Sequence, residues 1–294
     1  MYRGDLLGAE DYFARTHTSL SASSYRKIIR TFEYAMGHAA LVAWFLGRAD
    51  EARRQVRQII STGADSDIYK HAVSQTMATN LHVMLGHPDQ TAMFAAQAIA
   101  LCDEHGFHEV KWWAQTGFGW ARAQLGFAEE AIAIHREGIS TARESGSLVA
   151  ITWALTSLAE AEAEAEAEAE AQALAGSVTD ALAVIDEALT INPEERYFRP
   201  DAFRLRGEIR RKQRNDNLAE IDFREAIALA EGMSAKAWEL GAVASLAPLL
   251  RDSDRGGEAR AALAGIYGWF TEGFDTPDLQ EAKALLNELA RAGD

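Results

Sequence analysis

Short turn-like segments recur along this chain about every forty residues, and this spacing constrains the fold more than any other feature. The segments begin at Gly47, Gly86, Gly126, Gly176, Arg214 and Asp254, so four of the five intervals lie between 38 and 40 residues. Between them, apolar residues recur at helical spacing, as in EARRQVRQII at 51–60. Repeats of this length are typical of helical hairpins that stack in a row, each burying its apolar side only against its neighbours.

We therefore predict an all-α protein with a single helical-repeat domain over residues 1–294. Alanine, glutamate, leucine and arginine are abundant and only five prolines are present, which favours helix over strand. In the last predicted helix, Thr276 is a suitable N-cap and Pro277 a suitable first residue. The expected units are a half-repeat at 1–30, about six hairpins at 31–62, 67–106, 107–146, 147–193, 199–232 and 234–273, and a capping helix at 276–292.

One interval is ten or eleven residues too long, and it contains an Ala-Glu run at about 160–171. Alanine and glutamate both favour helix, and ten or eleven residues form about three helical turns, so the downstream phase is nearly kept. We predict an insertion that lengthens the first helix of one repeat, a low-complexity expansion without a function of its own. Glutamates four residues apart repel each other by a few tenths of a kcal/mol. The alternative, in which the run loops out, therefore stays open.

The finer pattern resembles the tetratricopeptide repeat. In one hairpin, Gly207 lies in the first helix and Phe223 in the second, flanked by Ala219 and Ala226; Gly119, Gly126 and Ala131 take the matching places in another. A glycine at a helix crossing lets two backbones approach, and a large residue fills the groove between them. The period exceeds the standard one, and Arg122 and Arg210 stand where a large apolar residue is usual. The resemblance implies a tetratricopeptide-like α-α superhelix.

A second resemblance is most specific at 267–286, YGWFTEGFDTPDLQEAKALL. Together with AKAWELGAVASLAPLLRD and MGHAALVAWFLGRADEA, it is similar to the C-terminal repeat region of a bacterial family that joins a class III adenylate or guanylate cyclase domain, or a DNA-binding domain, to a P-loop signalling ATPase. The Ala-Glu run and Pro248 depart from that family. The resemblance implies a regulatory repeat tail that works with an upstream cyclase or ATPase domain. No P-loop motif is present in this chain.

The N-terminal half-repeat resembles a turn and second helix without its first helix, which leaves apolar surface uncovered. We expect either a fragment of a larger or split gene product, or a homo-oligomer that packs through this edge. The net charge of −15 disfavours nucleic acid and anionic membranes as partners. The single cysteine, the absence of an apolar run of about 18 residues and the charged N-terminus lead us to expect a cytoplasmic protein.

Residues with possible catalytic or metal-binding chemistry form no convincing set. Cys102, His105 and His108 lie at one predicted helix end, whereas zinc sites usually draw four ligands from two separated pairs. His82 and His87 flank a turn, and Cys102 is best explained as a small buried thiol. We therefore expect no catalytic residue, no cofactor and no metal, and a protein that is not an enzyme.

In tetratricopeptide arrays the first helices line the concave face. Trp113 and Trp120, seven residues apart, could stack on a ligand, or could instead pack between repeats. Arg204 and Arg211 belong to a segment, 196–214, with eight of the 29 basic residues; they could grip a carboxylate or phosphate, or pair with neighbouring acids. The candidate groove residues are Tyr34, Leu41, Trp44, Thr76, Asn80, Val83, Trp113, Trp120, Gln124, Arg204, Glu208 and Arg211.

These features predict a non-enzymatic scaffold or sensor module that binds a peptide or partner protein in its concave groove. One alternative is a site for a small-molecule effector such as a sugar or nucleotide. Another is a structural module that self-associates through its N-terminal edge.

Overall fold

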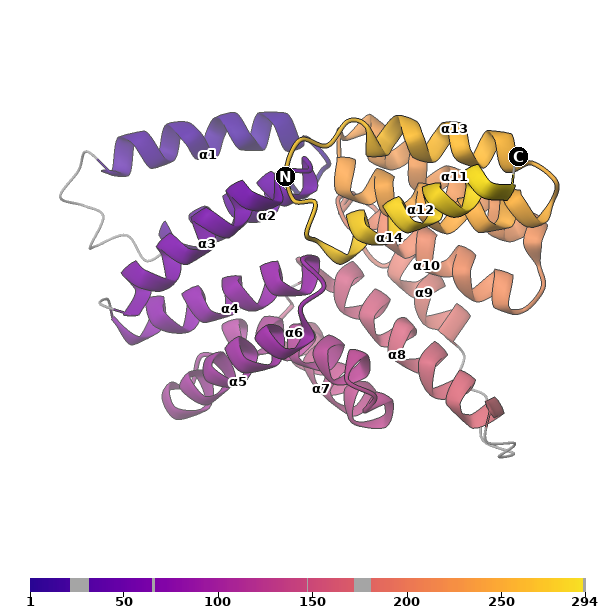
Figure 1. The fold of residues 1–294 in the computed structure, drawn as a ribbon. Coiled ribbons are helices and arrows are strands. Elements are labelled where there is room, and N and C mark those ends of the chain that lie inside the picture. The colour runs from indigo at the N-terminus through magenta and orange to yellow at the C-terminus, as the bar shows by residue number, and fades with distance from the viewer. Residues whose placement is uncertain (22–31, 65–66, 147, 172–180, 293–294) are drawn as a thin grey trace.

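The computed structural model describes residues 1–21, 32–64, 67–146, 148–171 and 181–292, and the regular structure in these ranges is α-helical throughout (Figure 1). The all-α prediction is confirmed. The helices are α1 Leu6–Ser21, α2 Phe32–Phe45, α3 Ala49–Ala64, α4 Ile68–Met84, α5 Pro88–His105, α6 His108–Gln124, α7 Ala128–Ser145, α8 Ile151–Ala171, α9 Ala181–Thr190, α10 Arg199–Lys212, α11 Asp216–Gly232, α12 Lys236–Asp252, α13 Gly256–Tyr267 and α14 Pro277–Ala292.

The helices alternate between two layers of a superhelix. The first helices of the hairpins, α2, α4, α6, α8, α10 and α12, contact one another in succession. Each of the second helices α3, α5, α7 and α11 makes its main contacts with the first helices before and after it. The first helices therefore form the inner layer, and they provide the surface that faces the groove.

Residues with left-handed backbone angles form the hairpin turns at several of the turn-like segments of the sequence. The hairpin turns use Gly47, Gly86 and Gly126, with φ angles of 80°, 68° and 84°, directly after a first helix. Arg214 and Asp254 take the same place in two later hairpins at φ of 59° and 57°. A side chain at such an angle costs about 1–2 kcal/mol relative to glycine, so these two turns are less relaxed than the others.

Arg214→Gly is expected to raise the free energy of unfolding by about 0.5–1 kcal/mol, because relief of the left-handed strain exceeds the extra chain entropy of the unfolded state. Urea unfolding followed by circular dichroism measures the change. Arg214→Ala is the control: it removes the exposed side chain and keeps the strain, so we expect no gain from it.

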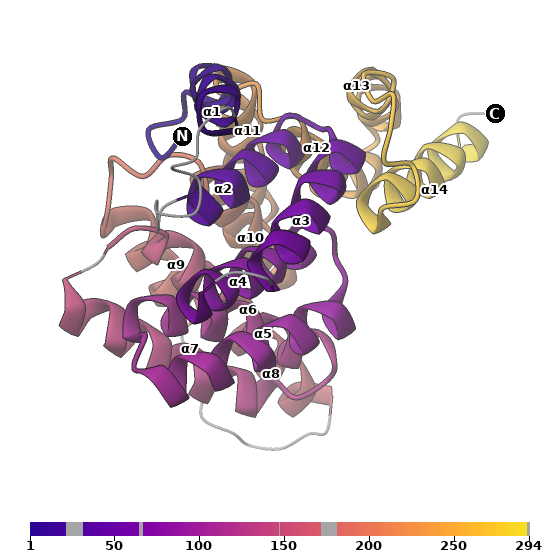
Figure 2. The same cartoon turned by 90° about the vertical axis from the view of Figure 1, so that its left-hand side faces the viewer.

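The superhelix closes on itself, which the repeat pattern does not predict. The rings of Trp44 in α2 and Trp238 in α12 lie 5.0 Å apart between centroids. Glu272, after α13, accepts hydrogen bonds from the backbone N–H groups of Asp50 and Glu51 at the start of α3, at 3.0 and 3.2 Å. Figures 1 and 2 show α2 and α3 beside the end of the array that holds α12 and α14. The expectation that each hairpin buries its apolar side only against its neighbours is therefore wrong.

The same closure covers part of the N-terminal edge. The backbone N–H of Arg196 donates to the carbonyl of Tyr2 at 2.7 Å, and the Tyr2 hydroxyl lies 2.7 Å from His38 Nε2. Leu6 is 1% exposed. The prediction of a bare edge is wrong for these residues. Leu7 and Tyr12 remain exposed on α1, and self-association through them stays a prediction.

The Ala-Glu run continues α8 as far as Ala171, so its described residues adopt the helical alternative and not the looped one. Ala159, Ala161 and Ala163 are buried. The nearly buried carboxylate of Glu162 accepts a hydrogen bond from Arg136 Nη2 at 2.9 Å. Gly176 and the other residues at 172–180 lie outside the described part of the chain.

The predicted helix crossings are present. A Cβ atom added to Gly207 in α10 would lie 2.6 Å from the Phe223 ring in α11, and one added to Gly119 in α6 would lie 2.7 Å from the His135 imidazole in α7. Both pairs are sixteen residues apart, so His135 occupies the place of Phe223. Glycine allows these side chains to reach the partner backbone.

The capping helix α14 begins at Pro277, and its apolar side packs on the last hairpin. Leu279, Ala282 and Leu289 are buried there. The Thr276 hydroxyl donates to the carbonyl of Gly273 at 2.8 Å, a bond within the preceding turn. Pro248 lies inside α12, which continues through it.

Candidate functional site

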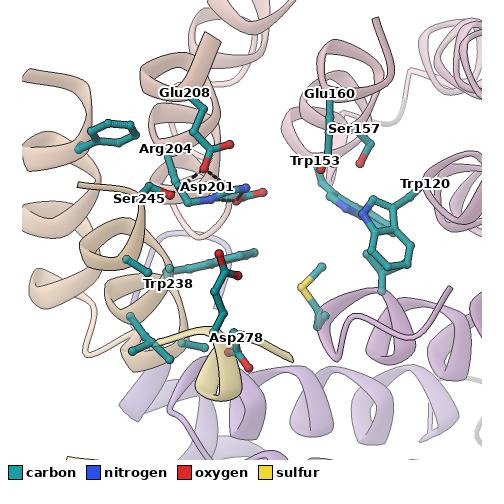
Figure 3. A pocket seen from close by; sticks show the side chains of 18 of the residues that line it. Trp120, Trp153, Ser157, Glu160, Asp201, Arg204, Glu208, Trp238, Ser245 and Asp278 are labelled. Atoms are coloured by element: carbon teal, nitrogen blue, oxygen red, sulfur yellow. Dashed lines mark hydrogen bonds and ion pairs between the residues drawn. The ribbon is translucent and has the colours of Figure 1, made fainter. Parts of the chain in front are cut away.

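A cavity of about 710 Å³ lies on the inner surface of the superhelix. Six successive first helices and the start of α14 contribute to it, so one space collects residues from nearly the whole chain. We call it the groove cavity. Figure 3 shows two facing walls, one from α6 and α8 and the other from α10 and α12. Its principal side chains are Trp44, Val83, Met84, Trp120, Trp153, Ser157, Glu160, Asp201, Arg204, Glu208, Arg211, Trp238, Ser245, Asp278 and Glu281.

Four of the seven tryptophans of the chain line this cavity. Trp238 is held by a hydrogen bond from its Nε1 to the carbonyl of Tyr197 at 2.9 Å, and Trp153 stacks on Phe198 with centroids 5.6 Å apart. Trp44 and Trp153 are buried, whereas Trp120 and Trp238 are half-buried. The last two therefore offer indole surface to a ligand, and rigid indoles provide contact area at a small entropic cost.

An ion cluster forms the α10 wall. Arg204 donates from Nε to Asp201 Oδ1 and from Nη1 to Glu208 Oε1, both at 2.8 Å, and the Ser245 hydroxyl donates to the same Glu208 oxygen at 2.7 Å. Burial opposes the charge on Arg204, but Glu208 and Asp201 outweigh it and raise the pKa of the guanidinium. Arg204 is thus a fixed cation whose hydrogen-bonding capacity is largely used within its own helix.

Glu160 stands on the opposite wall, on α8 (Figure 3). Burial raises the pKa of its carboxyl to about 8; Arg204 across the cavity opposes this rise, and Asp201, Glu164 and Glu208 add to it. Gln124, at the end of α6, places its Nε2 3.4 Å from Glu160 Oε1. At neutral pH this shift favours the protonated form of Glu160.

The predicted groove residues separate into two groups. Trp44, Val83, Trp120, Arg204, Glu208 and Arg211 line the groove cavity. Tyr34 and Trp113 both pack against His38, with ring centroids 6.4 and 5.8 Å from that of the imidazole. Asn80 is 2% exposed within α4, Leu41 and Thr76 are buried as well, and Gln124 is exposed at the rim.

The reason for this division lies in the packing of the inner layer. In the N-terminal half only residues toward the C-terminal ends of α2, α4 and α6 line the cavity, and α4 contacts both α2 and α6 with most of its residues buried. Residues seven apart on a straight helix also drift by about 20° around its axis. Trp113 and Trp120 consequently have different roles: the first packs between repeats, and the second faces the cavity.

The basic segment at 196–214 mostly pairs with acids, as the alternative interpretation expected. Arg206 and Arg210 converge on the buried carboxylate of Asp222, with nitrogen–oxygen distances of 2.7 and 2.6 Å. Arg211 pairs with Asp252 at 2.8 Å. An anionic ligand of Arg204 and Arg211 would have to displace these carboxylates, so the structure gives the anion-gripping interpretation no support.

Several cavity residues were not among the predicted ones. Trp153 and Trp238 lie in first helices, so the repeat register could have found them had it been applied to every hairpin. Asp278 and Glu281 come from α14, which closure of the superhelix brings to the cavity, and no local signal in the sequence identifies them.

Outside the groove cavity, the cysteine and histidine that the sequence analysis considered have the properties of buried core side chains. Cys102 is 1% exposed, and burial raises the pKa of its thiol to about 11. Burial has the opposite effect on a histidine: it lowers the pKa of His82 to about 4, and the nearby His87 adds to this shift. Within the described ranges, no group of three or more histidine, cysteine or acidic residues is arranged to hold a metal ion. No helix in those ranges combines the length and the apolarity that crossing a bilayer demands.

Comparison with solved structures identifies helical-repeat proteins of the same shape. The chain is similar to NprR in complex with its cognate peptide NprX, with a TM-score of 0.62 and 12% identity over 98% of this chain and 83% of that one. The apo form of the quorum sensor NprR from B. thuringiensis gives a TM-score of 0.57 at 12% identity, covering 98% and 81%.

A tetratricopeptide repeat protein from Parabacteroides merdae gives a TM-score of 0.52 at 13% identity, covering 98% of this chain and 93% of that one. No protein-family model matches the sequence, and no curated protein matches it. At these identities the likeness concerns the fold: the chain has the architecture of a tetratricopeptide-like helical-repeat protein.

Proposed function

We propose that the groove cavity binds a peptide, or an extended segment of a partner protein, and that the chain acts as a sensor or scaffold module without catalytic activity of its own. The observation that carries this proposal is the groove cavity itself, where half-buried indoles and fixed polar groups face each other across an open space. Such a surface suits recognition, because aromatic anchors give affinity and placed polar groups give specificity. The likeness to NprR, solved with its cognate peptide, supports a peptide as the ligand.

We also propose which kind of domain this module works with. Residues 267–286 resemble the repeat region of cyclase- and ATPase-linked signalling proteins, and we propose that ligand binding in the groove regulates such a partner domain. Co-expression of this chain with candidate cyclase or ATPase domains, followed by pull-down with and without peptide, tests the coupling. Unchanged capture in both conditions would reject it.

Trp120→Ala is expected to weaken peptide binding at least tenfold, equivalent to about 1.4 kcal/mol, while the melting temperature stays within a few degrees. The ligands are selected from a random peptide display library, and affinity is measured by calorimetry with the synthetic peptides.

Trp113→Ala is the matched control. It removes an indole of the same helix that packs between repeats, so we expect it to lower the melting temperature and to leave the affinity of the folded protein within about threefold. If the two substitutions had the opposite effects, the assignment of the groove cavity as the binding site would be wrong.

A small-molecule effector is the second candidate, because a volume of about 710 Å³ lies within the range of roughly 300–1,000 Å³ that such sites occupy. A thermal-shift screen against sugars and nucleotides separates the two. A ligand at 100 times its Kd stabilises the native state by about 2.7 kcal/mol. Stabilisation by one of these compounds, with no peptide recovered from the library, would favour the effector.

A further inference from the structure

The groove cavity has an excess of carboxylates over available cations. Five acidic side chains line it, Glu160, Asp201, Glu208, Asp278 and Glu281, against the three basic residues Arg204, Arg211 and Lys212. Arg204 is engaged by Asp201 and Glu208, and Arg211 is paired with Asp252 outside the cavity lining. Within the described ranges, Glu160, Asp278 and Glu281 make no ion pair across the cavity.

A second, independent feature lies one helical turn before Glu160. Ser157 is 4% exposed and lines the cavity, yet its hydroxyl has no hydrogen-bond partner among the described residues. Its neighbour Thr156 shows the usual solution for a helix, a hydrogen bond from the hydroxyl to the carbonyl of Thr152 at 2.7 Å. Because the Ser157 hydroxyl forms no hydrogen bond with another described residue, it can bond to a ligand atom without giving up an existing contact.

An aromatic surface adjoins these two groups. Trp120 lies one turn before Gln124 on α6, and Gln124 reaches Glu160 at 3.4 Å. Figure 3 shows Trp120, Ser157 and Glu160 along the same wall of the cavity. An indole next to a carboxylate suits an ammonium or guanidinium group, which gains from the ring face as well as from the opposite charge.

We propose that this wall of the groove cavity, formed by Trp120, Ser157 and Glu160, holds a lysine or arginine side chain of the bound peptide. This inference rests on the peptide-binding function proposed above and specifies the chemistry of its ligand. The basic group pairs with the Glu160 carboxylate and donates to the Ser157 hydroxyl, while its methylene stem or guanidinium plane lies on Trp120. Arg204 on the opposite wall is engaged by Asp201 and Glu208, so Glu160 remains open to a basic partner on the wall that it shares with Trp120 and Ser157.

Binding of a cation to this wall is coupled to loss of a proton. Burial holds the pKa of Glu160 at about 8, with Asp201, Glu164 and Glu208 raising it and Arg204 lowering it; Asp278 and Glu281 face the same cavity from α14. A bound ammonium or guanidinium favours the carboxylate, so nearly one proton leaves at pH 7. Affinity for basic peptides is expected to rise up to tenfold per pH unit from pH 6 to 8 and to level off above.

The test uses the full chain and four peptide pools of equal length, acetylated and amidated, whose central residue is lysine, arginine, norleucine or glutamate. Affinity is followed by quenching of tryptophan fluorescence. The expected result is at least tenfold tighter binding of the lysine and arginine pools than of the norleucine pool. Calorimetry at pH 7 in buffers of different ionisation enthalpy is expected to show release of close to one proton with the basic pools.

Three variants locate the effect. Glu160→Gln is expected to abolish both the preference and the proton release while the norleucine pool binds as before. Ser157→Ala is expected to weaken the basic pools about three- to tenfold without lowering the melting temperature, because the hydroxyl that it removes has no hydrogen-bond partner among the described residues. Glu166→Gln makes the same chemical change farther along the same helix and is the control. It should alter neither the preference for the basic pools nor the proton release.

The outcomes separate this inference from the peptide-binding function. Peptide binding without a preference for basic residues, or a preference that survives in Glu160→Gln, would overturn the inference and leave the function standing. Stabilisation by free cadaverine or agmatine, with no binding of any pool, would overturn the peptide as the source of the cation. No binding of pools or amines would overturn both.

Discussion

Phe223→Ala is expected to lower the free energy of unfolding by about 3–5 kcal/mol, the largest effect of any single change considered for this chain. The Phe223 ring is fully buried between α10 and α11, and a Cβ added to Gly207 would lie only 2.6 Å from it. The space left by the ring cannot be filled by Gly207, which has no side chain. Urea unfolding followed by circular dichroism gives the value.

A double-mutant cycle tests the physical reason. Gly207→Ala alone is expected to cost about 1–3 kcal/mol, since its methyl group overlaps the ring. In the Phe223→Leu background the same substitution should cost less, because the smaller side chain leaves room, and the interaction energy should exceed about 0.5 kcal/mol. Additive effects would mean that the two residues do not share this contact.

His135→Phe is expected to make the stability of the protein much less dependent on pH. His135 is 1% exposed, neither ring nitrogen has a hydrogen-bond partner among the described residues, and burial lowers its pKa to about 3. The unfolded chain, with a histidine pKa of about 6.5, binds more protons than the folded one as the pH falls below that value. Stability should therefore be lost on acidification, by about 2 kcal/mol between pH 7 and pH 5 from this residue alone.

The variant should lose that contribution and keep those of the other buried histidines. At pH 7 it should be as stable as the wild type or more so, because Phe223 shows that a phenyl ring fits the equivalent crossing against Gly207. Urea unfolding at pH 5, 6 and 7 measures the difference, with His108→Gln, at an exposed site, as the control. An unchanged pH dependence in His135→Phe would show that His135 is not the neutral buried group described here.

Whether a predicted residue lines the groove cavity depends on its position along the helix of its repeat. The register of the hairpins predicted Trp44, Trp120, Arg204 and Glu208 as groove residues, and these line the cavity. It failed for Tyr34 and Asn80, because the inner face of α2 and α4 is covered by neighbouring helices over most of its length. Helical periodicity in the sequence indicates which side of a helix is apolar. It does not indicate how much of that side the neighbouring helices cover.

The sequence by itself determined the local structure: the helices, the left-handed turns at Gly47, Gly86 and Gly126, and the sixteen-residue pairing of Gly207 with Phe223. These depend on contacts within a hairpin or between successive hairpins, which short patterns encode. Only the tertiary structure decided that Trp44 meets Trp238 and that Asp278 enters the groove cavity. Such contacts arise from the rotation between hairpins added over the whole array, and no local pattern in the sequence specifies that sum.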